Sequence, residues 1–214
     1  MDKKIIMENS ISYAKKFGID VSRDPFPWFL LSILFGARIS EEIASRTFYL
    51  FKREGIISPE KILETGWDGL VVLLDSGGYT RYDFKTATKL ISVSENIIRE
   101  GGLKKIHDES VDPDEFVRRL KSLSKGIGDV TIGIFMREMV DTWEKARPMP
   151  SYYARLAMEN LSLDVNSYRD LGIGYSIYEY FLHRVGKNCY RERCEKCPVR
   201  NECKKFKNKL LKNE

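Results

Sequence analysis

All four cysteines of this chain lie in one short stretch, KNCYRERCEKCPVRNECKK. Their spacing is C-x4-C-x2-C-x5-C, where x is any residue. Four thiolates in one loop can wrap a [4Fe–4S] cluster, which needs one cysteine sulfur for each iron. Zinc is the alternative, although structural zinc sites usually offer two C-x2-C pairs and this loop has one. The predicted metal ligands are Cys189, Cys194, Cys197 and Cys203.

The positive charge of the chain is concentrated around these cysteines. The formal net charge is +5, but from Arg184 onward 11 basic residues stand against 4 acidic ones, which gives +7 there and −2 for the rest. A concentrated basic stretch favours a polyanionic partner such as nucleic acid, and the alternative is a solvated tail. Arg191 and Arg193 lie between the first two cysteines and are predicted to contact phosphates.

A second stretch, LKSLSKGIGDVTIGIFM at 120–136, predicts a turn between two helices. One helix ends near Leu123, a KGIG turn follows, and the next helix starts at Asp129. The two glycines allow positive φ and close approach of another backbone. Backbone amides at such a turn suit a phosphate, and the alternative is an ordinary helix–turn–helix corner. The predicted DNA-binding residues here are Lys125, Gly126, Ile127, Gly128 and Thr131.

Nearly all the elements that position these motifs are predicted to be helices. A hydrophobic fraction of 43% favours a folded chain. Ser58 with Pro59, and Asp112 with Pro113, are typical of the N-cap and first position of a helix. Glycines end the predicted helices, and no sustained apolar–polar alternation indicates a strand. The predicted fold class is therefore all-α.

The longest apolar run, residues 27–37, is too short to span a bilayer. No charged-then-apolar leader opens the sequence. We therefore expect a cytoplasmic or nucleoid-associated protein with no membrane association. Thiols stay reduced in that compartment, which argues against the remaining alternative of two disulfides.

The glycine turn, followed some sixty residues later by four clustered cysteines, resembles the endonuclease III family of helix-hairpin-helix DNA glycosylases. DPFPWFLLSILFGARIS resembles the family's first core helix, LLDSGGYTRYDFKTATKL resembles its GFYRxKAxxL segment, and HRVGKNCYRERCEKCPVRNEC resembles its cluster loop. The resemblance covers roughly residues 24–206 and implies a [4Fe–4S] cofactor, double-stranded DNA as the partner and a monomer.

The same resemblance implies a fold of two helical domains. Residues 24–135 would form a six-helix barrel, with the helix-hairpin-helix at 113–140. Residues 1–23 and 136–214 would form a second domain that carries the cluster loop at 189–203. In the family, the DNA and the catalytic pocket lie in the cleft between the two domains.

Four residues near the implied pocket resemble the residues with which relatives hold an extruded base. Tyr79, Arg81 and Tyr82 precede the helix where relatives line the lesion pocket, and Tyr152 stands where the family's catalytic acid is expected. Arg38 falls approximately at the family's glutamine wedge. A guanidinium there could fill the gap in the duplex or stack on a base.

The chain departs from the family pattern at both usual catalytic positions. Val130 falls where bifunctional members keep their Schiff-base lysine, so covalent β-elimination is not available through that residue. Residues 148–150, where the family aspartate is expected, hold no acid. The nearest acids are Asp141 and Glu144, which are the candidate catalytic residues.

Three functions follow from these motifs. The first is a monofunctional DNA glycosylase for base-excision repair that extrudes a damaged or mismatched base. The second is a protein on the same scaffold that binds lesions or structured DNA without cleaving it. The third is an electron-transfer protein whose basic surface docks an acidic partner.

Overall fold

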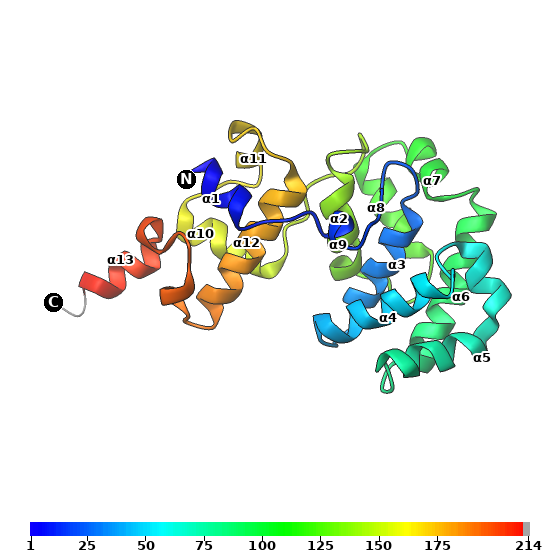
Figure 1. Ribbon diagram of the computed structural model, residues 1–214. Helices are drawn as coiled ribbons and strands as arrows, with labels where there is room; N and C mark the ends of the chain where they lie inside the picture. Colours follow the sequence, from blue (N-terminus) through cyan, green and yellow to red (C-terminus); the bar gives the residue numbers. More distant parts are fainter. Residues whose placement is uncertain (212–214) are drawn as a thin grey trace. The chain divides into compact units, whose positions relative to one another are not determined.

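The computed structural model describes residues 1–211, with side chains up to residue 208, and every regular element in that range is a helix (Figure 1). The predicted all-α class is confirmed. The chain divides into two compact units. Unit 1 comprises Met1–Gly18, Met136–Asp141 and Pro148–Glu214, and unit 2 comprises Ile19–Phe135 and Thr142–Arg147.

Unit 2 is built around one helix that is buried on all sides. Every residue of this helix from Phe26 to Leu34 is buried, and the Trp28 side chain donates a hydrogen bond to the Phe135 carbonyl oxygen at 3.0 Å. The helix that follows it in the chain packs directly against it. The helices are α3 (Phe26–Phe35), α4 (Glu41–Arg53), α5 (Pro59–Gly77), α6 (Asp83–Arg99), α7 (Leu103–Glu109) and α8 (Pro113–Ser122).

The predicted helix starts of unit 2 are confirmed. The Ser58 side chain accepts a hydrogen bond from the Lys61 amide at the start of α5, and Asp112 accepts one from the Glu115 amide at the start of α8. Each cap satisfies a backbone N–H group that has no partner within its own helix. The Asp112 cap fixes the residue at which α8, the helix that precedes the glycine turn, begins.

Unit 1 is organised around a pair of helices, α10 (Tyr152–Leu161) and α12 (Tyr175–Tyr190), which pack along each other (Figure 1). Their buried faces form a separate hydrophobic core that includes Ala154, Tyr178 and Leu182. The smaller elements of the unit are α1 (Lys3–Glu8), α2 (Tyr13–Lys16), α11 (Ser167–Asp170), η1 (Cys194–Lys196), η2 (Arg200–Glu202) and α13 (Lys204–Leu211).

Helix α9 (Asp129–Met139) begins in unit 2 and ends in unit 1. The chain then returns to unit 2 for residues 142–147 before it completes unit 1. Within residues 1–211 there is no helix whose length and apolar content would let it cross a membrane.

Candidate functional site

The turn between α8 and α9, residues 123–128, is here called the glycine hairpin. The Ile127 amide donates to the Ser124 carbonyl oxygen at 3.2 Å, and the Ile127 side chain is only 5% exposed. Gly126 has φ +90°, a conformation that favours glycine. Gly128 has no positive φ, so only the first of the two glycines uses this freedom. The buried isoleucine anchors the turn while its glycines and Lys125 face solvent.

Polar side chains of α6 hold this hairpin in place. The Asn96 amide donates to the Leu123 carbonyl oxygen at 2.7 Å, and the Ser92 hydroxyl reaches the same oxygen at 3.5 Å. Lys89, one turn earlier on α6, lies against Gly126, where an added Cβ would be 3.4 Å from the lysine Nζ. Three successive turns of α6 therefore present polar groups to the hairpin.

The charges at the hairpin leave two lysines available. Lys121 forms an ion pair with Asp129 at 2.6 Å, which offsets the carboxylate at the start of α9. Neither Lys125 nor Lys89 forms an ion pair in the part of the chain that the structure describes. Burial lowers the pKa of Lys89, because a partly desolvated ammonium group is less stable than one in water. An anion at Gly126 would stabilise that charge.

Thr131 and Tyr79, which were predicted to face DNA and an extruded base, are buried, and these two predictions need correction. Thr131 is 3% exposed and packs on Gly36, where an added Cβ would lie 2.2 Å from the threonine Oγ1. Its hydroxyl therefore cannot reach a phosphate. Tyr79 is fully buried and donates a hydrogen bond to the Leu34 carbonyl oxygen, so it belongs to the core and not to a base pocket. Burial raises the pKa of Tyr79.

The remaining base-pocket and wedge residues predicted in unit 2 are accessible or half-buried. Arg81 is exposed, and its guanidinium lies 5.8 Å from the centre of the half-buried Tyr82 ring. Arg38 is exposed just after α3. The Arg81–Tyr82 pair therefore brings a cation over an aromatic face at cation–π distance.

The cysteine loop, residues 189–203, is a run of tight turns in unit 1. Cys189 lies in the last turn of α12, and Cys203 directly precedes α13. The short helices η1 and η2 form in the segment between them. Backbone hydrogen bonds hold these turns, including Arg193 N–H to the Asn188 carbonyl at 2.9 Å and Cys197 N–H to the Cys194 carbonyl at 3.1 Å. The loop is therefore shaped by its own main chain.

All four cysteines line one small pocket. Its walls are largely apolar and include Ala157, Leu161 and Phe206. No disulfide joins the four thiols. Across the described residues, no group of three or more His, Cys, Asp or Glu is arranged to hold a metal ion. The four thiols therefore line a common cavity without forming a metal-binding group in this structure.

The thiols themselves are in an environment that disfavours uncompensated thiolates. Burial raises the pKa of Cys189 and of Cys197, and the charges of the neighbouring cysteines raise it further. The Asn160 amide lies 3.6 Å from the Cys189 sulfur, in position to donate a weak hydrogen bond to it. As thiolates, the four sulfurs would repel one another around one pocket, and a positively charged group would compensate that charge.

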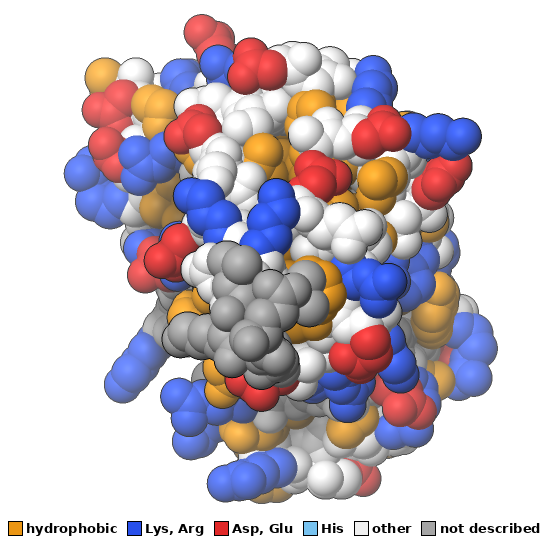
Figure 2. Space-filling view, turned by 90° about the vertical axis from the view of Figure 1, so that its left-hand side faces the viewer, with side chains coloured by type: hydrophobic (Ala, Val, Ile, Leu, Met, Phe, Trp, Pro, Cys, Tyr) orange, Lys and Arg blue, Asp and Glu red, His pale blue; other side chains and the backbone are white. Residues whose placement is uncertain are grey.

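The surface of the loop carries four exposed basic and three exposed acidic side chains, which are Arg191, Arg193, Lys196 and Arg200 against Glu192, Glu195 and Glu202. Lys and Arg side chains lie in several groups on the face shown in Figure 2, with Asp and Glu between them. Arg191 and Arg193 are both exposed, as predicted for phosphate contacts. Of the basic residues counted from the sequence, Lys212 lies outside the described residues, and the side chain of Lys209 is not described either.

The two candidate acids differ in what they contact. The carboxylate of Asp141 accepts hydrogen bonds from the backbone N–H groups of Tyr175 and Ser176 at the start of α12. Glu144 is exposed and makes no hydrogen bond or ion pair within the described part of the chain. Glu144 is therefore the acid that remains available for chemistry.

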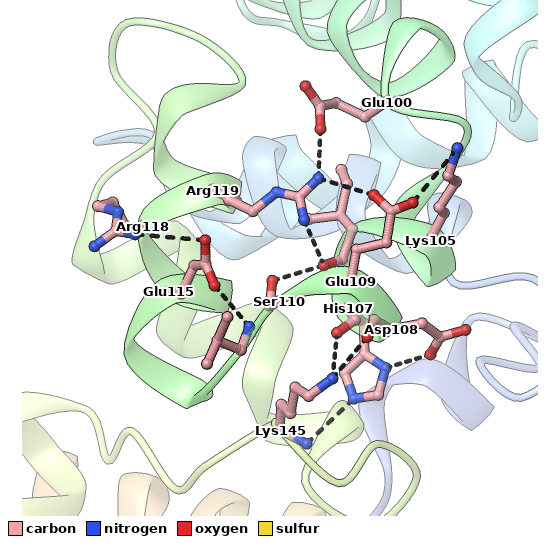
Figure 3. A network of polar contacts seen from close by, with 12 residues as sticks. Glu100, Lys105, His107, Asp108, Glu109, Ser110, Glu115, Arg118, Arg119 and Lys145 are labelled. Atoms are coloured by element: carbon pink, nitrogen blue, oxygen red, sulfur yellow. Dashed lines mark hydrogen bonds and ion pairs between the residues drawn. The ribbon is translucent and has the colours of Figure 1, made fainter.

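The backbone beside Glu144 is held by a polar network that the sequence did not reveal (Figure 3). His107 Nε2 accepts a hydrogen bond from the Lys145 amide at 3.1 Å, and Lys145 Nζ donates to the carbonyl oxygens of His107 and Asp108. His107 Nδ1 lies 2.8 Å from the Asp108 carboxylate, and its ring packs against Trp143. The segment 142–147 is thereby fixed to α7.

A second network lies in unit 1 under residues 149–153. Arg137 forms a buried ion pair with Glu179, whose carboxylate also accepts a hydrogen bond from the Ser151 amide at 3.1 Å. The Ser151 hydroxyl contacts His183 Nδ1 at 3.0 Å. In the sequence, only the i, i+4 spacing of Glu179 and His183 on α12 indicated that these two side chains share a helix face. Their partners Arg137 and Ser151 are distant in sequence, so the network itself was not predictable.

Comparison with known proteins adds no family to this description. A scan against protein-family models finds no match, and neither does a search of the curated proteins.

Proposed function

We propose that this protein binds double-stranded DNA and removes a damaged or mismatched base as a monofunctional N-glycosylase of the endonuclease III type. The observation that carries the proposal is the glycine hairpin. Its buried Ile127 fixes a turn whose glycines and Lys125 face solvent, with Lys89 beside them. Backbone amides and two cations at one turn suit a DNA phosphate, which is held without regard to sequence.

The cysteine loop supports the same proposal. Cys189, Cys194, Cys197 and Cys203 would hold a [4Fe–4S] cluster in the pocket that they line, and zinc remains the alternative. The group would supply a covalent cross-link between the turns of the loop. Arg191 and Arg193 would then present their charges from a fixed backbone to the DNA.

Base release is a hydrolysis of the N-glycosidic bond. The bond between the sugar C1′ and the base breaks, and the base leaves with the bonding electrons and takes up a proton. Water adds to C1′, and its proton passes to a carboxylate, for which Glu144 is the candidate. Val130 carries no amine, so no covalent intermediate forms at that position and the product is an abasic sugar.

The test is base release from a panel of lesion-containing and mismatched duplexes, with iron content measured on the same anaerobic preparation. We expect release by the wild type, loss of release in Glu144→Gln, and retention of DNA binding in that variant. Full activity in Glu144→Gln would exclude this acid. Absence of iron, with zinc present, would replace the cluster by the alternative metal.

A second function is lesion binding without cleavage. The observation that favours it is the engagement of Asp141 with α12, which removes one of the two acids near the expected position. Tight binding to lesion duplexes with no release from any of them would select this function. No binding to any duplex, even at low salt, would exclude both DNA functions and favour the electron-transfer protein.

A further inference from the structure

A cluster of three tyrosines, two exposed and one half-buried, lies where α10 and α12 meet in unit 1. Tyr152 and Tyr190 are 58% and 59% exposed, which is unusual for large aromatic side chains in direct contact. Their ring centres are 6.2 Å apart, and Tyr153 lies 5.5 Å from Tyr152 and 5.6 Å from Tyr190. This set of residues is here called the tyrosine cluster.

The backbone forces these rings together. A Cβ added to Gly186 of α12 would lie 1.8 Å from the Tyr153 carbonyl oxygen, so only glycine permits the observed approach of the two helices. The contact between Ser151 and His183 ties the start of α10 to α12 one turn away. Tyr153 also packs edge-on against the His183 ring at 5.2 Å. The cluster is therefore a rigid feature of the helix pair.

The geometry leaves ring faces open. The three tyrosine pairs meet at steep interplanar angles of 67°, 83° and 64°, so no ring covers the face of another as in a parallel stack. Edge-to-face packing together with high exposure leaves flat apolar surface in contact with water. Such surface matches the face of an unpaired nucleobase.

The charges around the cluster point to the same ligand. Lys187 lies one turn before Tyr190 on α12, Arg191 follows Tyr190 directly, and Arg155 lies one turn after Tyr152 on α10. Exposed aromatic rings flanked by cations are the combination that binds single-stranded nucleic acid, because the rings stack bases and the cations meet the phosphates.

We infer that the tyrosine cluster binds unpaired bases of single-stranded DNA by stacking. The inference rests on the proposed function for its nucleic-acid partner and on the ring geometry for its mode of binding. It adds an unpaired strand to the duplex ligand already proposed, and it assigns Tyr153 and Tyr190 to DNA recognition.

The test compares two fluorescent strands of equal charge with the full chain. One is an oligothymidylate of about 12 nucleotides, within the usual range of single-strand sites. The other is an abasic strand of the same length. We expect the wild type to prefer the thymidine strand. Tyr190→Ala should weaken binding of that strand roughly tenfold, the range of one stacked base, and should leave the abasic strand unchanged.

Two variants complete the experiment. Tyr190→Phe keeps the ring and should bind as the wild type does, and Tyr49→Ala removes an exposed tyrosine of unit 2 and should have no effect. Equal affinity of the wild type for both strands would overturn the inference, as would equal losses on both strands in Tyr190→Ala. Duplex binding is measured in parallel. Its absence, with thymidine binding intact, would overturn the proposed function alone.

Discussion

Asp141 and Tyr175 are joined by a hydrogen bond of 3.0 Å from the Tyr175 amide to the aspartate carboxylate. The second carboxylate oxygen accepts from the Ser176 amide at 3.3 Å. Gly174, at the N-cap of α12, has no side chain with which to cap the helix. The acid that follows α9 in the chain therefore supplies the cap, and its negative charge faces the positive end of the helix.

Replacing Asp141 by alanine should lower the free energy of unfolding by about 0.5–2 kcal/mol, the usual effect of losing a helix cap. Glu144→Ala should change it by less than about 0.5 kcal/mol, because that side chain is exposed and has no described partner. Urea denaturation measures both. Equal effects of the two substitutions would contradict the capping role.

The buried pair Arg137–Glu179 should respond strongly to the loss of one partner. Burial alone would raise the pKa of Glu179, but the charge of Arg137 and hydrogen bonds from Ser151 hold it below its ordinary value. Glu179→Gln leaves an uncompensated buried cation and should cost about 3–5 kcal/mol of unfolding free energy.

The matched control is the exposed pair Arg147–Asp114, in which Arg147→Gln should cost less than about 1 kcal/mol. The two variants are compared by chemical denaturation in the same buffer. Similar losses in the buried and the exposed pair would show that burial does not set the strength of these interactions.

Glu138 should produce a pH dependence of the opposite sign to that of an ordinary paired acid. Burial raises its pKa above the ordinary value of 4.5, despite hydrogen bonds from the Ser12 hydroxyl and the Ala14 amide. The folded state therefore holds this proton more tightly than the unfolded chain does. The corresponding stability is fully present below the unfolded pKa and is lost as pH rises through the folded pKa.

Glu138→Gln removes this titration. Urea denaturation at pH 4 and pH 7 gives the unfolding free energy of the variant minus that of the wild type. This difference should be more favourable to the variant at pH 7 than at pH 4. The comparison uses differences between variant and wild type, so that other titrating groups cancel. If this difference instead became less favourable to the variant as the pH rose from 4 to 7, the Glu138 carboxylate would be stabilised in its charged form.

Gly186→Ala should disrupt unit 1. The new methyl group would overlap the Tyr153 carbonyl oxygen, which is backbone and cannot rotate away. We expect a loss of at least about 1–3 kcal/mol, as for other overpacked contacts, together with a weaker tyrosine signal in near-UV circular dichroism. Gly128→Ala is the control, since nothing lies within 4 Å of its added Cβ. An undisturbed Gly186→Ala protein would mean that α10 and α12 are free to move apart.

Lys89 should contribute one phosphate contact to DNA binding, if the proposed function holds. Lys89→Gln should weaken binding and reduce the magnitude of the salt slope, d log K/d log[salt], by about 1. Lys85→Gln removes the exposed lysine four positions earlier, on the same face of α6 but one turn farther from Ser92 and Asn96, which hold the hairpin, and should change the slope less than Lys89→Gln does. Equal slopes for both variants would remove Lys89 from the hairpin site, whereas no binding by the wild type would reject the function itself.

Local signals in the sequence predicted local structure well. Serine or aspartate followed by proline located the starts of α5 and α8, because a cap and the residue it satisfies are only three positions apart. Glycines located helix ends because the end of a helix also depends on residues only a few positions apart. The turn after α8 and the burial of Ile127 also followed from a short motif.

Residue roles that depend on distant partners were not predictable. Tyr79 and Thr131 were assigned to a surface site, yet both are buried against residues of α3 or its C-terminal glycine. The cap that Asp141 provides spans 34 positions in the sequence. A tyrosine, a threonine or an aspartate looks the same in the sequence whether it faces water or another helix, and only tertiary packing decides.

The order in which the two units can form on the ribosome follows from the path of the chain. All of unit 2 has been synthesised once Arg147 has emerged, whereas unit 1 unites Met1–Gly18 with segments made last. The N-terminal residues therefore cannot pack until later segments are synthesised. For example, the hydrogen bond from the Ser12 hydroxyl to Glu138 can form only after α9 has been made. A nascent chain arrested once Arg147 has left the ribosomal exit tunnel should contain a folded unit 2 and an N-terminal segment whose partners in unit 1 have not yet emerged.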